Sequence, residues 1–484
     1  MKLSFPVRIY ILALLLRLIP VLAARGLGIG LDDMFQYDML ARSLASGNGY
    51  RWYAQEDLKL LEPYVDFDLS TASGYDPQYG VYTSFRAPLY PVFLALVYSV
   101  SGLEFSRFFA ARLAQAILLG APLAPLTYWV AKHLSSFLSP GETNEEKNIE
   151  RTARLSAWVV ACYPILLVYP LGLGTENLFF VLLLVSFLFL LKSLQKPTVF
   201  SFLLSGLFLA LTALTRSVIL PFAGLAILYL LFLHGRRAAL VVLSFALTVS
   251  PWIVRNSLLH NKLTGIETSM GYNLYLGYHP DGNGSFVFGP SLDLLTIMDD
   301  AERDETGTQK ALEFIRESPG RFIPLALNRL GFFFGLEKRV LMYFYSNNLL
   351  GYIPAPLLLS IAAVLLLPFV FLSLFAALGL SLLKRSPQTT LLWMLFFAYI
   401  LPHVLILAED RFHLALIPWF AILAAYSIVT IREKGLAGIG RRRLAFAAVL
   451  VFLLLFNWGL ELYRDADKIS TLLGPDGNTS HFPY

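Results

Sequence analysis

The sequence predicts an all-α protein that crosses a membrane many times. Three observations predict this class: the chain has 484 residues, 57% of them are hydrophobic, and only 15% are charged. Soluble domains average about 25% charged residues, so this chain lacks the polar surface that a water-soluble fold of its length needs. The composition therefore excludes collagen-like, disordered, disulfide-stapled and nucleic-acid-binding classes, and we expect no nucleic-acid partner.

A transmembrane helix needs about 20 mostly apolar residues, and about eleven segments come near that length. They fall at about 6–24, 106–133, 153–170, 175–193, 199–215, 218–234, 237–254, 353–383, 390–408, 411–431 and 444–462. Lys2 and Arg8 lie before the apolar part of the first segment, as basic residues do in a signal peptide. However, Arg17 interrupts the apolar run, and the Ala23-Ala24 end is a poor cleavage site. We interpret it as an uncleaved span.

Basic residues fall in alternate short loops, which predicts the orientation of the chain. The rich set holds Lys132, Lys147, Arg151, Arg154, Lys192, Lys196, Arg236, Arg237, Lys384, Arg385, Arg432, Lys434, Arg441, Arg442 and Arg443. The intervening short loops show only Arg216 and Arg411. Because Lys and Arg resist translocation, the rich loops are expected in the cytoplasm. This predicts a multi-pass protein of the cytoplasmic membrane with its N-terminus inside and its C-terminus outside.

Two long connections on the outer side divide the chain. We expect an N-terminal transmembrane module at 1–254, which includes an outer loop at 25–105 that carries an acidic pair. An outer loop region at 255–350, C-terminal transmembrane helices at 351–463 and an outer tail at 464–484 follow. Loops of this length usually carry function or structure of their own.

Three local features of this organisation can also be predicted. Pro88–Ser101 is apolar but short, which indicates a helix in the membrane interface or half of a broken span. A charged segment at about 299–318 should be helical and end at Pro319-Gly320. The single cysteine, Cys162, excludes an intrachain disulfide, and we expect it to be a small buried apolar side chain.

Ionisable residues gather at the outer end of the predicted helices. They are Asp32, Asp33, Glu176, Arg216, Arg255, Glu409, Asp410, Arg411 and His413. Charges at membrane depth are costly, so they are functional hypotheses by default. Simpler interpretations stay open. Asp32 can cap a helix, and Glu176 can be favoured by the positive end of the helix that it begins. Arg216 and Arg411 can extend their charged groups to the membrane interface.

The mixture of carboxylates and cations suits sugar transfer from a lipid phosphate. That reaction needs a carboxylate to take the proton of the acceptor hydroxyl. It also needs Arg, Lys or His to hold the departing phosphate, whose negative charge grows as the bond breaks. Cationic side chains can do this electrostatic work, so no metal or other cofactor is required, although a divalent cation is compatible with it.

Eight motifs carry a family resemblance. They are LDDMFQYDMLARSLASGNGY (31–50), FRAPLYPVFLAL (85–96), GTENLFFVLLL (174–184), LTRSVILP (214–221), PWIVRN (251–256), GYNLYLG (271–277), ALEFIRESPGRF (311–322) and EDRFHLALIPWFAILAA (409–425). In this order the chain resembles the polytopic GT-C glycosyltransferases, in the branch of the protein O-mannosyltransferases and the lipid A aminoarabinose transferases. The resemblance spans about 400 residues and implies a GT-C-like bundle with two long extracytoplasmic loops.

The resemblance implies an inverting glycosyltransferase that uses a polyprenyl-phosphate sugar at the extracytoplasmic face. Asp32 then looks like the general base, with Asp33 as its neighbour or a substrate-orienting group. The substrate-binding residues that it implies are Arg86, Tyr90, Glu176, Arg216, Arg255, Asn256, Arg411 and His413. Phe412 is a departure, because the family usually shows Tyr after this Arg. The implied partners are the donor, membrane lipid, and an acceptor lipid, glycan or protein.

Two other functions compete with this one. A flippase or transporter of lipid-linked saccharides would use similar polar groups, but it should place charges near the bilayer midplane, and many transporters show internal repeats. We find no internal repeat in this chain. A polysaccharide ligase or polymerase would share the donor type and differ in its acceptor.

Overall fold

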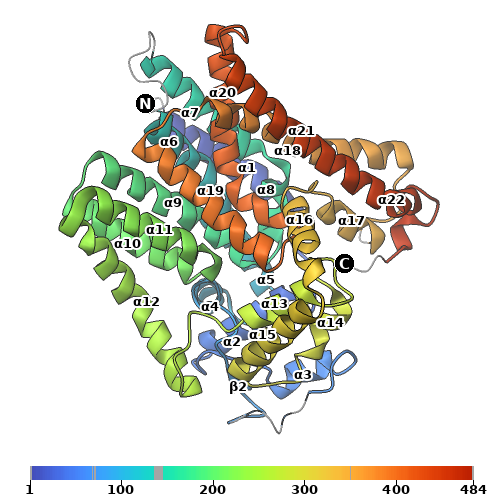
Figure 1. The fold of residues 1–484 in the computed structure, drawn as a ribbon. Helices are drawn as coiled ribbons and strands as arrows, with labels where there is room; N and C mark the ends of the chain where they lie inside the picture. The colour runs from blue at the N-terminus through green and yellow to red at the C-terminus, as the bar shows by residue number, and fades with distance from the viewer. Residues whose placement is uncertain are drawn as a thin grey trace.

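The computed structural model of the chain describes residues 3–67, 69, 72, 74–135, 145–348 and 350–481, and it is built almost entirely of α-helices. The long apolar helices form a bundle (Figure 1). Its members are α1 (Phe5–Ala23), α5 (Arg107–Ala114), the π-helix η2 (Gln115–Gly120), α6 (Leu123–Ser135), α7 (Glu145–Cys162), α8 (Pro164–Val168), α9 (Thr175–Gln195), α10 (Val199–Ala213), α11 (Leu220–His234), α12 (Ala239–His260), α18 (Ala355–Leu382), α19 (Pro387–Leu405), α20 (Ile417–Lys434) and α21 (Arg441–Arg464).

Among the described residues, eight helical stretches are long and apolar enough to cross a membrane, or nine if the bent pair α7 and α8 counts as one span. The protein is therefore a multi-pass membrane protein. The predicted count of eleven is not confirmed. Two features account for the difference: α11 and α12 count together as one 44-residue stretch, and α10, with 15 residues, is a shorter apolar helix.

A second set of helices lies at one end of the bundle, opposite the end that holds the N-terminus and the start of α21 (Figure 1). The chain segments between α1 and α5 and between α12 and α18 supply it. Its helices are α2 (Asp33–Ala45), α3 (Gln55–Leu61), α4 (Leu89–Ser101), α13 (Met270–Tyr278), α14 (Phe288–Asp293), α15 (Asp300–Glu317), α16 (Phe322–Phe333) and α17 (Arg339–Ser346). The predicted helices at 88–101 and 299–318 are thereby confirmed as α4 and α15.

Residues 25–105 also form a short antiparallel sheet of β1 (Arg51–Trp52) and β2 (Val81–Tyr82), in which Arg51 pairs with Tyr82. In the predicted tail, α22 (Ala466–Leu472) packs Leu472 against Tyr345 and Leu358, while residues 482–484 lie outside the described ranges. The tail is thus tied back to α17 and α18.

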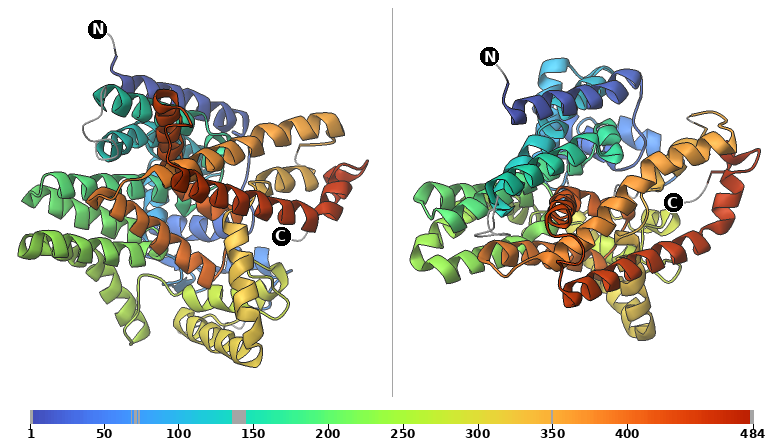
Figure 2. Two further views of the ribbon diagram at one scale, coloured as in Figure 1. Left: turned by 45° about the horizontal axis from the view of Figure 1, so that its top comes forward. Right: turned by 90° about the horizontal axis from the view of Figure 1, so that it is seen from above.

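The peripheral helix α21 shows why so many apolar side chains are exposed. It lies at the edge of the bundle in Figure 1 and in the right-hand view of Figure 2, and Phe452, Phe456 and Tyr463 are exposed along it. A helix that is apolar all round and little buried in protein needs lipid around it. The same reasoning corrects the prediction for Cys162, which is exposed rather than buried in the protein. It lies at the end of α7, where an apolar surface can face lipid tails.

Arg17 has a structural role inside the bundle. Its side chain is fully buried, and the guanidinium donates to the carbonyl oxygens of Ala13, Val160 and Ala161. These acceptors belong to α1 and α7, so Arg17 joins the two helices. A buried cation is tolerated here because backbone carbonyl groups receive its hydrogen bonds.

Buried ion pairs fix α2, the helix that begins at the acidic pair. Asp38 is buried, and its carboxylate accepts hydrogen bonds from Arg42, Arg107 and the Tyr98 hydroxyl at 2.8–2.9 Å. Arg42 also donates to Asp57 at 2.7 Å. These contacts join α2 to α3, α4 and α5, and they therefore hold the start of α2 in place over the bundle.

We expect Asp38→Ala to destabilise the protein strongly. The change leaves the Arg107 guanidinium without its carboxylate partner and Arg42 with Asp57 alone, and breaking a buried ion pair typically costs about 3–5 kcal/mol of unfolding free energy. Unfolding of the purified protein in detergent measures the loss. The matched control is Ala at the exposed Asp66 in the same segment, which should change stability by less than about 0.5 kcal/mol. Equal stability of the two variants would contradict this role for Asp38.

Candidate active site

Asp32 lies at the N-cap of α2. Its backbone is extended, and its Oδ1 atom accepts the backbone N–H of Met34 at 2.8 Å. An aspartate is a favoured cap because its oxygen satisfies an N–H group that the first turn leaves unpaired. The residue is exposed, and within the described ranges its Oδ2 atom makes no hydrogen bond. One carboxylate oxygen is thus used by the cap, and the other stays available to a substrate.

Asp33 joins two arginines that are far apart in the sequence. Its Oδ1 atom accepts a hydrogen bond from Arg86, and its Oδ2 atom lies 3.6 Å from Nη2 of Arg411. Arg86 is oriented further by Gln36, whose Oε1 atom accepts from its Nε at 2.8 Å. The contact between Asp33 and Arg411 is longer than a hydrogen bond, and the Arg411 side chain is 38% exposed, so a ligand can still reach its guanidinium.

The pKa values of the two neighbouring carboxyl groups are shifted in opposite directions. Neighbouring protein atoms reduce the hydration of the Asp32 carboxylate, and the adjacent Asp33 charge also opposes its ionisation. Both effects raise the pKa of Asp32. Loss of water acts on Asp33 too, but the guanidiniums of Arg86 and Arg411 outweigh it and lower the pKa of Asp33. Asp33 therefore stays ionised as an anchor for arginines, while Asp32 is the stronger base of the two.

Further ion pairs surround these residues. Glu409 is buried, and its Oε2 atom lies 2.8 Å from Nε of Arg411 and 2.7 Å from Nη1 of Arg339. At the start of α9, Glu176 contacts Arg216 at 2.6 Å. The Phe412 ring faces the guanidiniums of both Arg216 and Arg411, at 5.6 and 5.7 Å from its centroid. We call this set the mixed-charge cluster: Asp32, Asp33, Arg86, Glu176, Arg216, Arg339, Glu409 and Arg411.

Residues of the second long connection hold the backbone that leads to Arg86. The Asp300 carboxylate accepts hydrogen bonds from the Thr83 hydroxyl at 2.5 Å and the Ser84 N–H at 2.8 Å. The Ser84 hydroxyl is 2.7 Å from Nε2 of His260, and Nη1 of Arg255 donates to the Thr83 carbonyl at 2.6 Å. Thr83, Ser84 and Asp300 are all buried. This contact, which we call the loop clamp, positions Arg86 beside Asp33.

The structure thus brings together six of the ten predicted site residues: Asp32, Asp33, Arg86, Glu176, Arg216 and Arg411. Four others have different surroundings. Arg255 belongs to the loop clamp, and Asn256 donates to the carbonyls of Gly265 and Ile266. Tyr90 is buried and donates to Gln115 at 2.8 Å, and His413 is buried against Glu337. The side chains of Tyr90, Asn256 and His413 are thus buried and hydrogen-bonded to other parts of the protein.

Sequence reasoning missed three members of this environment as site residues. Glu409 was visible as a charge at the outer end of a span, and its position beside Arg411 was the available signal. Gln36 lies one helical turn after Asp32, within reach of the same end of α2. Arg339 lies in no recognisable motif. Only the fold of the second long connection brings it to Glu409, so the sequence carried no signal for this contact.

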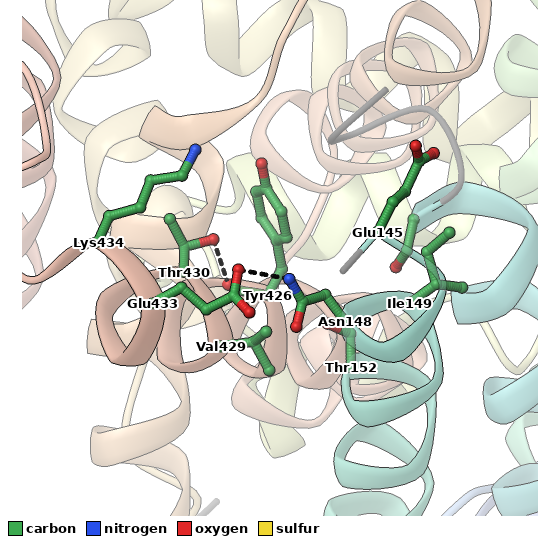
Figure 3. A pocket seen from close by; sticks show the side chains of 10 residues that line it. Glu145, Asn148, Ile149, Thr152, Tyr426, Val429, Thr430, Glu433 and Lys434 are labelled. Carbon is green, nitrogen blue, oxygen red and sulfur yellow. Dashed lines mark hydrogen bonds between the residues drawn. The ribbon is translucent and has the colours of Figure 1, made fainter. Parts of the chain in front are cut away.

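Two hollows in the structure lie away from the cluster. Figure 3 shows a cavity of about 20 Å³ between α7 and α20, where Asn148 donates a hydrogen bond to Glu433. It has room for about one water molecule. An open groove of about 460 Å³ runs past His260, Asp299 and Glu305. Within the described ranges, no group of three or more His, Cys, Asp or Glu side chains is arranged to hold a metal ion.

Comparison with known proteins gave a similarity among solved structures. No protein-family model and no curated protein matched the sequence. Among solved structures, the chain is similar to the crystal structure of ArnT from Cupriavidus metallidurans bound to undecaprenyl phosphate, over 88% of this chain and 78% of that one. The TM-score is 0.38 and the sequence identity 13%.

Proposed function

We propose that the protein is an inverting glycosyltransferase that moves a sugar from a polyprenyl-phosphate donor to an acceptor hydroxyl. The observation that carries this proposal is the juxtaposition of a base and anion-binding groups at one end of the bundle. Asp32 is exposed, its pKa is raised, and it adjoins a carboxylate that holds Arg86 and faces Arg411. Acid–base catalysis and phosphate binding thus meet in one place.

Each residue has a defined part in the proposed reaction. Asp32 accepts the proton of the acceptor hydroxyl while its oxygen attacks the anomeric carbon of the donor sugar. The bond between that carbon and the phosphate oxygen breaks on the opposite face, which inverts the anomeric centre. Arg411 receives the departing phosphate through its planar guanidinium, which can donate two parallel hydrogen bonds. Asp33 orients Arg86 and keeps the positive charges close to the phosphate.

The membrane arrangement that we propose follows from the charge pattern and the fold. The loops rich in Lys and Arg are expected in the cytoplasm, which places α2 and the cluster at the extracytoplasmic face. A single straight helix of 44 residues would be about 66 Å long at 1.5 Å per residue, about twice a bilayer core, so we count two spans in the 44-residue stretch that holds α11 and α12. Together with α10 and the bent pair, this gives the eleven spans expected from the sequence. The chain is then a protein of the cytoplasmic membrane, and a polyprenyl tail can lie between its helices and lipid.

Incubation with polyprenyl-phosphate sugars tests the proposal. The purified protein in liposomes receives a panel of polyprenyl-phosphate monosaccharides together with a lipid extract as acceptor, and mass spectrometry follows the donor. Loss of the sugar from the donor, with its appearance on an acceptor, is the expected result. Movement of intact donor between the leaflets would instead identify a flippase. Consumption of only lipid-linked oligosaccharides would identify a ligase or polymerase.

We also expect the rate of sugar transfer to fall on the acid side of its pH profile. This acid limb should lie at a higher pH than an aspartate of ordinary pKa would give. Asp32 acts only when it is ionised, and its raised pKa keeps it protonated to a pH above the usual value of about 3.9. Activity should therefore fall as the pH drops through this raised pKa. Asp33→Asn removes the neighbouring negative charge, which lowers the pKa of Asp32 and moves the limb to lower pH. The limb should stay in place in Asp66→Asn, and a limb that stays in Asp33→Asn would contradict the assignment.

A further inference from the structure

His413 lies two residues after Arg411 in a short 3-10 helix, η7 (Asp410–Leu416), yet it faces away from the mixed-charge cluster. Its side chain is fully buried, and both ring nitrogens are engaged. Nδ1 is 2.7 Å from the Phe333 carbonyl oxygen, and Nε2 is 3.0 Å from Oε1 of Glu337. The Phe369 ring stacks on the imidazole at 4.1 Å. No atom of this ring is left to contact a substrate.

The hydrogen bonds define where the protons lie. A carbonyl oxygen only accepts, so Nδ1 of His413 carries a proton. The Tyr163 hydroxyl donates to Oε1 of Glu337 at 2.6 Å, and one further proton lies between that oxygen and Nε2. The network joins η7 to the start of α8, the end of α16 and, through Phe369, to α18. Three other parts of the chain therefore fix the position of His413.

The segment that supplies Glu337 holds η7 on both sides of Arg411. Glu337 contacts His413, two residues after Arg411, and Arg339 contacts Glu409, two residues before it. Lys338, between them, lies 2.5 Å from Asp465 at the end of α21 and also contacts Glu461, so the segment is itself anchored. The Arg411 side chain is left to reach Asp33.

We propose that His413 and Glu337 are positioning residues, which set the place of Arg411 relative to Asp33 without contacting the donor. This inference rests on the proposed function, because Arg411 is taken there to receive the departing phosphate. It replaces the sequence-based prediction that His413 binds substrate. A displacement of about 1 Å at a reacting group can cost about 100-fold in rate, so a residue held outside the site can matter greatly.

A double-mutant cycle tests the proposal. We expect His413→Ala to lower kcat/KM for the donor by about 10- to 100-fold. If His413 acts only through Arg411, adding His413→Ala to Arg411→Ala should change kcat/KM by less than about twofold. Full additivity of the two losses would overturn the proposal, because it would mean that His413 contributes independently of Arg411.

A conservative variant separates positioning from general damage to the fold. In Glu337→Gln the amide N–H can donate to Nε2 of a neutral His413, while the Tyr163 hydroxyl keeps a partner, so kcat/KM should stay within about threefold of wild type. Glu337→Ala lacks these bonds and should resemble His413→Ala. An equal loss in Glu337→Gln and Glu337→Ala would overturn the role of the hydrogen bonds.

A structural measurement makes the inference independent of the proposed reaction. Cryo-electron microscopy of His413→Ala in nanodiscs should show Arg411 displaced from Asp33 while the helix bundle is unchanged. An undisplaced Arg411 would overturn the positioning role even if transfer is confirmed. Conversely, wild-type protein that transfers no sugar would refute the proposed function, and a displaced Arg411 would still support the structural part.

Discussion

Replacing Asp32 by asparagine should reduce sugar transfer by about 100-fold or more while the protein stays folded. In the proposed reaction the lost group is the base that accepts the hydroxyl proton, and general base catalysis typically contributes 10²–10⁴-fold. Asparagine is as good an N-cap as aspartate, so the bond to the Met34 N–H and the start of α2 should survive. Steady-state transfer with the true donor measures the loss, and unfolding in detergent confirms the fold.

The matched control for this experiment is Asp66→Asn, the same change at an exposed aspartate in the same connection between α1 and α5. It should transfer at the wild-type rate. Full activity of Asp32→Asn would remove Asp32 from the mechanism. Loss of activity together with loss of stability would show that the residue is needed mainly as a cap.

The second large effect is expected at Arg411. In the proposed reaction Arg411→Ala deprives the departing phosphate of a charged donor, and removal of one such donor typically costs about 10²–10³ in kcat. Glu409 keeps Arg339 as a partner at 2.7 Å, so the buried carboxylate is not left without a cation. Transfer kinetics and binding of undecaprenyl phosphate, measured separately, should both be impaired.

Two further variants make the Arg411 result specific. Arg411→Lys keeps the charge but lacks the planar pair of donors, so we expect activity between those of wild type and Arg411→Ala. Arg316→Ala removes an exposed arginine of α15 and should leave transfer unchanged. Unimpaired phosphate binding in Arg411→Ala would show that the phosphate lies elsewhere.

The sequence predicted those parts of the fold and site that depend on local patterns. Apolar runs of about 20 residues identified the long helices, because hydrophobicity is a property of the segment itself. Asp32 and Asp33 follow the first span directly, and Arg216 and Arg411 lie at helix ends, so their common end of the bundle could be predicted from the alternation of the spans. The number of spans predicted from the sequence differs from the number of long apolar helices in the structure at short helices such as α10.

The rest depends on long-range packing that a local pattern does not encode. His413 and Arg411 are two residues apart, yet one faces the packed interior and the other faces Asp33. Only the fold of α16 and α17 beside η7 decides this. Arg339 approaches Glu409 for the same reason. Arg255 matched a family motif, but its partner is the backbone of Thr83, and no spacing in the sequence predicts that pair.

The loop clamp also has a consequence for biosynthesis. Asp300, which accepts hydrogen bonds from the Thr83 hydroxyl and the Ser84 N–H, lies 217 residues after Thr83 in the chain. At about 5–20 residues per second, a ribosome needs roughly 10–40 seconds to synthesise that stretch. During this interval the segment that leads to Arg86 has been synthesised without the carboxylate that secures it, so the proposed active site is completed only late in translation.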